Sequence, residues 1–157
     1  MKDINAFESL LLSLTEAGVD YMLAGGFAVN FHGYSRTTSD LDIWVRPDES
    51  NKIPIINALI KEGFPNEARK LIGDLDFSKP FSFSLGLEPM DVDIFNHITG
   101  VTFESAFPNK IPYTYSENLV VNYISLQDLI VNKMLTNRSK DKLDVETLQK
   151  IINLRKK

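Results

Sequence analysis

Two aspartates interrupt an apolar strand pattern in the segment HGYSRTTSDLDIWV, residues 32–45. Successive side chains of a strand point to opposite faces of a sheet, so Leu41 and Ile43 would share one face. Asp40 and Asp42 would leave the other face together. At about 4–6 Å and an effective dielectric near 20, their repulsion is roughly 3–4 kcal/mol, which a fold tolerates when a cation lies between them. The pattern predicts a rigid strand that presents two carboxylates to a positive charge.

A second acidic strand is indicated by MDVDIF, residues 90–95, which would place Val92 and Ile94 on one face. Asp91 and Asp93 would share the opposite face. Carboxylate oxygens on rigid strands are ligands that Mg²⁺ or Mn²⁺ prefers, especially where the ion also binds phosphates. One of these two aspartates is expected to be a third acid of the same site. The apolar residues on both sides favour Asp93, whereas Asp91 lies near the strand start and is expected to be solvated.

Two glycines end the apolar run VDYMLAGG, residues 19–26, before FAVNFHG. This order indicates a buried strand, a tight turn and a short helix. Because they lack a Cβ atom, Gly25 and Gly26 would let the backbone approach a ligand, and the amides that begin the helix could bind phosphate. A plain turn would need the same residues. Neither GxGxxG nor GxxxxGKS occurs, so a dinucleotide-binding or P-loop mechanism is not supported.

The remaining periodicity predicts helices packed on a mixed sheet. Helices are expected over residues 5–17, 51–63, 124–135 and 139–154, an edge strand over 81–87, and two short strands within 111–125. The side chains expected to face the core from the last three helices are Ile53, Ile56, Ile60, Leu126, Leu129, Ile130, Met134, Leu143, Leu148, Ile151 and Ile152. This order predicts an α/β or α+β fold, with a mixed sheet flanked by helices, as a single domain over residues 1–157.

Composition limits the chemistry. Without cysteine, the chain has no disulfide, thiolate zinc site or cysteine nucleophile. A net charge of −4 argues against an extended nucleic-acid surface, although a small tRNA or nucleotide site is allowed. No segment approaches the roughly twenty apolar residues that cross a bilayer, and acids interrupt the N-terminal apolar stretch. A cytoplasmic protein that does not bind membranes is expected.

The motifs AGG, HGYSRTTSDLDIWV and VDIF together resemble the nucleotidyltransferase (DNA polymerase β-like) superfamily. They are most similar to small bacterial nucleotidyltransferases of the minimal type, some of which belong to toxin–antitoxin or abortive-infection systems. The late segment NKMLTNRSKDKLDVETL also matches, so the resemblance extends from about residue 21 to 148. It implies the nucleotidyltransferase fold and Mg²⁺-dependent transfer of a nucleoside monophosphate from an NTP such as ATP to a hydroxyl acceptor, with release of pyrophosphate. The acceptor could be a small molecule, a tRNA or a protein.

The resemblance also implies residue roles. Asp40, Asp42 and Asp93 would be the catalytic carboxylates and would hold two Mg²⁺ ions or, alternatively, Mn²⁺. The third of them would accept the proton of the attacking hydroxyl. The nucleotide-binding residues would be Gly25, Gly26, Arg36, Thr38, Ser39 and Lys133.

The basic and hydroxyl residues of this set are also compatible with ordinary structural roles. The planar fork of Arg36 suits phosphate oxygens, although a surface arginine accounts for it equally well. Lys133 could line a cleft or extend into solvent, and only the resemblance assigns it to the cleft. Thr38 and Ser39 could cap a helix, bind phosphate or form a turn.

An alternative function is that of a binding module, a nucleotidyltransferase-fold toxin or antitoxin partner whose activity is secondary or lost. An apolar surface on the strands within residues 111–125 would favour it. The residues expected to form an exposed ion-paired network at the start of the last helix are Arg138, Lys140, Asp141 and Asp144. His32 and His97 are expected to be structural or solvated, and Trp44 to lie in the core or at its rim.

Overall fold

An open, mixed six-stranded sheet runs through the protein in the order β3-β4-β2-β1-β6-β5. The computed structural model describes residues 5–88, 90–136 and 138–156. The strands are β1 (Tyr21–Ala24), β2 (Asp40–Val45), β3 (Ser82–Leu87), β4 (Met90–Phe95), β5 (Ile111–Ser116) and β6 (Leu119–Tyr123). β2 is parallel to β4 and antiparallel to β1, β6 is parallel to β1, and the edge strands β3 and β5 pair antiparallel with β4 and β6. The predicted mixed sheet with flanking helices is confirmed as an α+β architecture.

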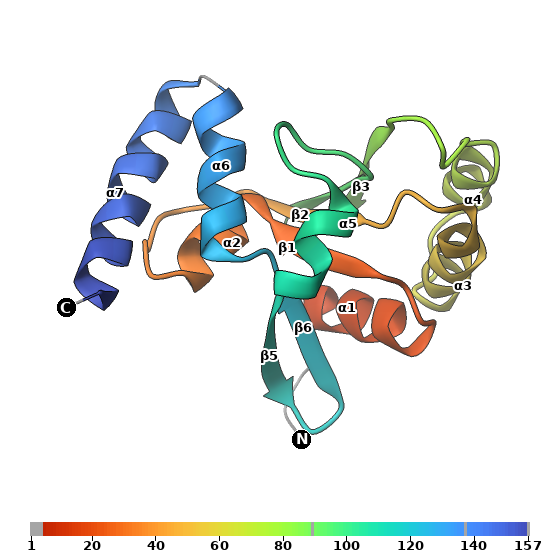
Figure 1. Ribbon diagram of the computed structural model, residues 1–157. Coiled ribbons are helices and arrows are strands. Elements are labelled where there is room, and N and C mark those ends of the chain that lie inside the picture. The colour runs from red at the N-terminus through yellow and green to blue at the C-terminus, as the bar shows by residue number, and fades with distance from the viewer. Residues whose placement is uncertain (1–4, 89, 137, 157) are drawn as a thin grey trace.

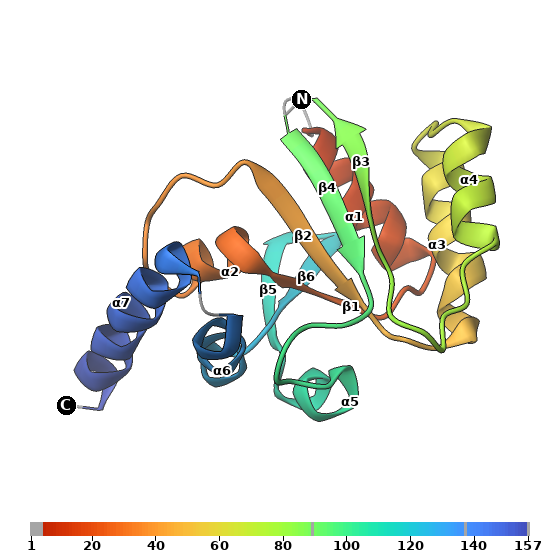
Figure 2. The same cartoon turned by 90° about the horizontal axis from the view of Figure 1, so that it is seen from above.

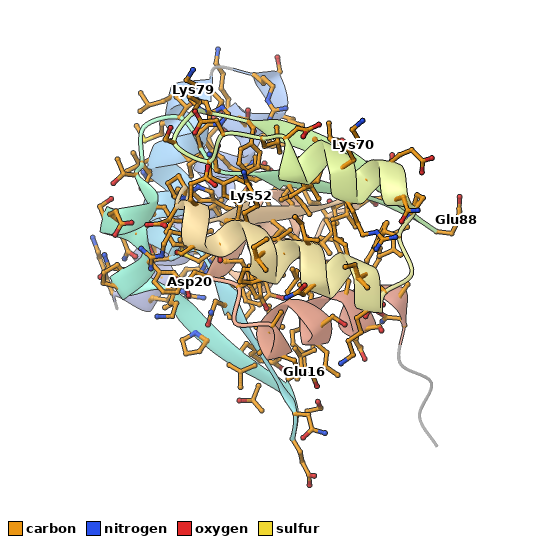
Figure 3. All side chains as sticks on the ribbon, turned by 90° about the vertical axis from the view of Figure 1, so that its right-hand side faces the viewer. Glu16, Asp20, Lys52, Lys70, Lys79 and Glu88 are labelled. Carbon is orange, nitrogen blue, oxygen red and sulfur yellow. The ribbon has the colours of Figure 1, made fainter. Side chains whose placement is uncertain are left out.

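The helices pack around this sheet. They are α1 (Ala6–Glu16), α2 (Gly25–Phe31), α3 (Lys52–Lys61), α4 (Asn66–Gly73), α5 (Phe103–Ala106), α6 (Leu126–Thr136) and α7 (Ser139–Arg155). Both cartoon views place α3 and α4 on one side of the molecule and α6 and α7 on the opposite side (Figures 1 and 2). Charged side chains such as Glu16, Lys52 and Lys70 lie over the face formed by α1, α3 and α4 (Figure 3). Within the described residues, every helix is too short or too polar to cross a lipid bilayer.

The centre of the sheet is the core of the molecule. All four residues of β1 are buried, and Leu41, Ile43 and Val45 of β2 are almost fully buried, as the alternation predicts. Trp44 is also fully buried, and its ring meets Phe103 edge to face at 5.3 Å between centroids. This packing makes Trp44 a core residue and fixes β2 as a rigid support.

The predicted core face of α3 is wrong at Ile53 and Ile60, although Ile56 is partly buried against the core as predicted. Ile53 is 60% exposed and Ile60 is 47% exposed, whereas Ile55, Ala58 and Leu59 are buried. Both sets have helical spacing, so the periodicity of this isoleucine-rich segment did not decide between them. The packing of α3 between α1 and α4 selects the second face.

The predicted apolar stripe of α6 is correct except at its end. Leu126, Leu129 and Ile130 are buried, but Met134 is 59% exposed and Lys133 is only 5% exposed. Positions 126, 129, 130 and 133 continue the spacing of one helical face, so the lysine occupies the place expected for an apolar side chain. On α7, Leu148 is buried as expected, whereas Leu143 is 54% exposed.

Candidate active site

The two acidic strands lie next to each other in the sheet. In the parallel register of β2 and β4, Asp40 is opposite Asp91 and Asp42 is opposite Asp93. Residues paired in this way project from the same face of a sheet. Asp91 is exposed, while Asp93 is half-buried. The register brings Asp42 and Asp93 together from segments far apart in the chain.

Both acidic strands border a pocket of about 290 Å³. Three of its lining residues are the predicted carboxylates Asp40, Asp42 and Asp93. The other described residues that line it are Ala24, Gly25, Gly26, Arg36, Ser82, Phe95, Ile98, Asn132, Lys133, Arg138 and Lys140. The pocket therefore combines carboxylates from the sheet with cations from the loop before β2, from α6 and from α7.

The two glycines pack against this site. Gly25 has a φ of +60°, and a Cβ atom added to it would lie 1.8 Å from Asp42 Oδ2. A Cβ atom on Gly26 would lie 2.3 Å from Thr38 Oγ1. A side chain at either position would displace a neighbouring polar group, so both glycines are needed for the present geometry.

The carboxyl group of Asp42 is held in an unfavourable setting for a negative charge. Burial raises its pKa, the charges of Asp93 and Asp40 and a hydrogen bond with Asp93 raise it further, and the positive charge of Lys133 opposes them; the resulting pKa is about 7. Ser84 Oγ donates a hydrogen bond to Asp93 Oδ1 and so orients the second carboxyl group. An added cation between these carboxylates would relieve their repulsion.

The predicted basic residues are ion-paired at the pocket wall. Lys133 Nζ lies 3.1 Å from Asp141 Oδ1 and 2.9 Å from Asp144 Oδ2. Arg36 Nε lies 3.0 Å from Asp144 Oδ1, and Arg36 Nη2 donates to Asp144 Oδ2 at 3.1 Å. Arg138 Nε donates to Asp141 Oδ2 at 2.6 Å. The network predicted for the start of the last helix is thus present for Arg138, Asp141 and Asp144, but its aspartates are buried, and none of the ion pairs between described residues includes Lys140.

Asp141 is stabilised as an anion in this network. Burial alone would raise its pKa, but hydrogen bonds from Arg138, Thr136 and Lys133 outweigh burial and lower it to about 2. The expectation that this network is a surface feature is wrong, since Asp141 and Asp144 are 0% and 1% exposed. Such burial is tolerated only because neighbouring cations compensate the two negative charges.

The donor chemistry of the site fits a hard divalent cation. Carboxylate oxygens are suitable ligands for Mg²⁺ or Mn²⁺, and the repulsion that raises the pKa of Asp42 would be offset by a bound ion. Within the described part of the chain, no group of three or more His, Asp or Glu side chains is placed so that it could hold a metal ion by itself. The open arrangement of Asp40, Asp42 and Asp93 would hold an ion only together with ligands from a substrate or water.

The remaining sequence-predicted residues lie beside the pocket. Thr38 Oγ1 donates to the backbone oxygen of Asp40 at 3.3 Å, and Ser39 is exposed. Neither Thr38 nor Ser39 is among the described residues that line the pocket.

The pocket also contains residues that sequence reasoning did not assign to it. Asn132, Arg138 and Lys140 line it, although Arg138 and Lys140 were assigned to a surface network. Their proximity to Lys133 in the chain was a usable signal, because residues on either side of a tight connection between two helices lie close together. Comparisons of the chain with protein-family models and with curated proteins found no match.

Proposed function

We propose that the protein is a nucleotidyltransferase, which transfers a nucleoside monophosphate from an NTP to a hydroxyl acceptor. The observation that supports this most strongly is the parallel pairing of Asp42 with Asp93, which line one pocket together with Asp40, Arg36 and Lys133. Carboxylates and cations that line the same pocket suit a substrate that carries both a metal ion and a polyphosphate chain. The sequence motifs and this pocket together favour the nucleotidyltransferase fold.

The proposed reaction uses the residues of the pocket as follows. Arg36 and Lys133 bind the phosphate groups of the NTP and orient its α-phosphorus toward the acceptor hydroxyl. The hydroxyl oxygen bonds to the α-phosphorus, its proton passes to Asp93, and the bond to the bridging oxygen of the leaving pyrophosphate breaks. Ser84 orients Asp93 through its hydrogen bond. Gly25 leaves room for the carboxyl group of Asp42.

Asp40, Asp42 and Asp93 would hold Mg²⁺ or Mn²⁺ in this proposal. A bound divalent ion supplies charge neutralisation for the carboxylates and for the phosphate oxygens. The chain itself keeps Asp40 and Asp42 on a rigid strand between β1 and β4.

The test is incubation with each α-labelled NTP and Mg²⁺, alone and with bulk tRNA, cell extract or candidate small molecules. Asp42→Asn and Asp93→Asn keep side-chain size and are expected to lower transfer by at least about 100-fold. Asp91→Asn is the matched control, because Asp91 is an exposed aspartate on β4, the strand of Asp93. This substitution is expected to change transfer by no more than about two-fold. Transfer by Asp42→Asn at the wild-type rate would contradict the assignment of Asp42 as a catalytic carboxylate. Loss of transfer in Asp91→Asn but not in Asp93→Asn would assign the role of the third acid to Asp91 instead of Asp93.

A second function, that of a toxin or antitoxin partner, is favoured by the surface of β5. Every residue of this edge strand is exposed, and Ile111, Tyr113 and Tyr115 are 40%, 48% and 47% exposed. Apolar surface on an unpaired strand edge is a common site for protein association. Absence of ATP and GTP binding in calorimetry with Mg²⁺, together with co-purification of one partner that Tyr113→Ser releases, would favour this function over transfer.

A further inference from the structure

A buried carboxylate behind the pocket has no role in the proposed reaction. Asp144 is 1% exposed, and it is not among the described residues that line the pocket. Its two oxygens nevertheless contact two cations that do line the pocket, with Asp144 Oδ1 beside Arg36 Nε and Asp144 Oδ2 beside both Arg36 Nη2 and Lys133 Nζ. One side chain of α7 therefore joins the loop before β2 to α6.

The contacts of Asp144 leave hydrogen-bond donors available on both cations. A guanidinium group has five N–H donors. Arg36 Nη2 donates to Asp144 Oδ2, whereas Arg36 Nε is buried 3.0 Å from Asp144 Oδ1 without a hydrogen bond to any described residue. Nη1 donates to the backbone oxygen of Thr37 at 3.3 Å, which still leaves an N–H on each terminal nitrogen. An ammonium group has three donors. Lys133 donates one of them to Asp141 Oδ1, and its Nζ also lies 2.9 Å from Asp144 Oδ2. The remaining donors of Arg36 and Lys133 can contact an anion without loss of the ion pairs.

Burial makes this arrangement rigid. Arg36 and Lys133 have side chains that are 19% and 5% exposed, far below what a mobile surface cation would show. Separating either cation from Asp144 would leave a buried carboxylate without full compensation, which is costly. The two cations are therefore restricted to one relative position.

We propose that Asp144 is a positioning residue that holds Arg36 and Lys133 as one fixed pair on the pocket wall, ready to bind adjacent phosphate groups. The identity of the anion as a polyphosphate rests on the proposed function. Because the pair is ordered before the ligand arrives, little side-chain entropy is lost on binding. Asp144 thus strengthens anion binding although it is itself an anion.

This proposal gives a result opposite in sign to that of simple electrostatics. Asp144→Asn removes a negative charge next to the pocket, so charge alone predicts tighter binding of an anion. Loss of positioning predicts weaker binding. Glu146→Gln is the matched control, because it makes the same charge change at an exposed position of α7.

The experiment is calorimetric titration with inorganic tripolyphosphate in the presence of Mg²⁺. Asp144→Asn is expected to bind about ten-fold more weakly than the wild type, and Glu146→Gln within about two-fold of it. In the protein without ligand, ¹⁵N relaxation of the Arg36 Nε–H group is expected to change from rigid in the wild type to mobile in Asp144→Asn. Circular dichroism verifies that each variant is folded.

Equal or tighter tripolyphosphate binding by folded Asp144→Asn, or a rigid Arg36 in that variant, would overturn the positioning role. If Asp144→Asn does not fold, Arg36→Lys replaces it, since it keeps the charge but loses the fork that Asp144 contacts; unchanged affinity in Arg36→Lys overturns the proposal. If the wild type transfers a nucleoside monophosphate from an NTP, the proposed function stands even when the Asp144→Asn or Arg36→Lys result overturns the positioning role. A wild type that binds neither tripolyphosphate nor any NTP overturns both.

Discussion

Gly25 is the residue on which the shape of the site depends most directly. Its φ of +60° is strained for any side chain, and a Cβ atom would lie 1.8 Å from Asp42 Oδ2. Gly63 has a similar φ of +78°, but a Cβ atom there would meet nothing within 4 Å. A comparison of substitutions at Gly25 and Gly63 therefore distinguishes the cost of backbone strain from the cost of displacing Asp42.

Gly63→Ala is expected to lower the free energy of unfolding by about 1–2 kcal/mol, the cost of backbone strain alone. Gly25→Ala adds the clash with Asp42, so a loss of about 3 kcal/mol is expected, together with loss of NTP binding. Urea denaturation and calorimetry measure both effects. Equal stability losses in the two variants would show that Asp42 moves aside without cost.

At the scale of single residues, the acidic pattern was readable because strand alternation fixes which side chains share a face. The two-residue period of a strand was enough to place Asp40 and Asp42 on one face, and the apolar neighbours of Asp93 favoured it over Asp91 as the third acid. The burial of Lys133 was not readable, because it depends on Asp141 and Asp144, whose own burial contradicts their usual surface position. A cluster of opposite charges becomes predictable only when the helices that carry it are placed.

Lys133 and Met134 are adjacent in α6, but substitutions at the two positions are expected to change stability by very different amounts. Lys133→Met removes a cation that lies within 3.1 Å of Asp141 and Asp144 and leaves both carboxylates undercompensated. A loss of about 3 kcal/mol in the free energy of unfolding is expected. Met134→Lys changes a side chain that is 59% exposed, so an effect within about 0.5 kcal/mol is expected. Thermal and urea denaturation test this pair, and similar losses in both variants would contradict the assigned face.

At the scale of elements, caps and alternation were more informative than helix faces. Asn5 and Glu8 have the spacing of a capping box before an apolar run, and Asn5 caps α1 by accepting a hydrogen bond from the backbone N–H of Glu8 at 2.9 Å. The alternation of 81–87 predicted β3 as an edge strand, which the strand order confirms. The helix α4 was missed, because Asn66–Gly73 has few apolar residues and follows Pro65 in the least regular part of the sequence.

His32 connects three elements and should make stability depend on pH. It caps the C-terminus of α2, its Nε2 lies 2.8 Å from the oxygen of Ile124 after β6, and Arg155 of α7 donates to its backbone oxygen at 3.3 Å. Burial lowers the pKa of His32, the hydrogen bond to Ile124 opposes this, and the charge of Arg155 lowers the pKa further. The neutral ring is therefore favoured in the folded state.

Because its folded-state pKa lies below the ordinary value of 6.5, His32 contributes stability that is present above pH 6.5 and is lost as pH falls through the folded-state pKa. His32→Gln keeps a side-chain donor for Ile124 and is expected to lose less stability than the wild type between pH 7 and about pH 5. His97→Gln is the control, since His97 is exposed and the chain has only two histidines. Asp42, whose pKa is raised, contributes with the opposite sign in all three proteins, so only the differences between their curves are interpreted. A pH dependence of His32→Gln that matches the wild type would exclude this role.

The arrangement of the whole molecule could be predicted only in outline. The alternation of helices and strands indicated a mixed sheet with flanking helices, but not that β2 lies between β1 and β4. That order places Ala24 and the adjacent Gly25 on one side of Asp42 and Asp93 on the other. Long-range pairing of strands depends on the packing of both faces of the sheet, which local sequence patterns do not contain.

The pocket draws on β1, α2, β2, β3, β4, α6 and α7, so a ligand bound there should stabilise the whole fold rather than one segment. ATP with Mg²⁺ at about 100 times its dissociation constant would add about 2.7 kcal/mol to the free energy of unfolding. For a domain of this size, a rise of about 5 °C or more in the midpoint of thermal unfolding is expected. Replacement of Mg²⁺ by EDTA is expected to remove most of the rise, because the bare triphosphate would face the three carboxylates without a neutralising ion. Asp93→Asn should lose the rise and Asp91→Asn should keep it; an equal rise in EDTA would show that ATP binds away from Asp40, Asp42 and Asp93.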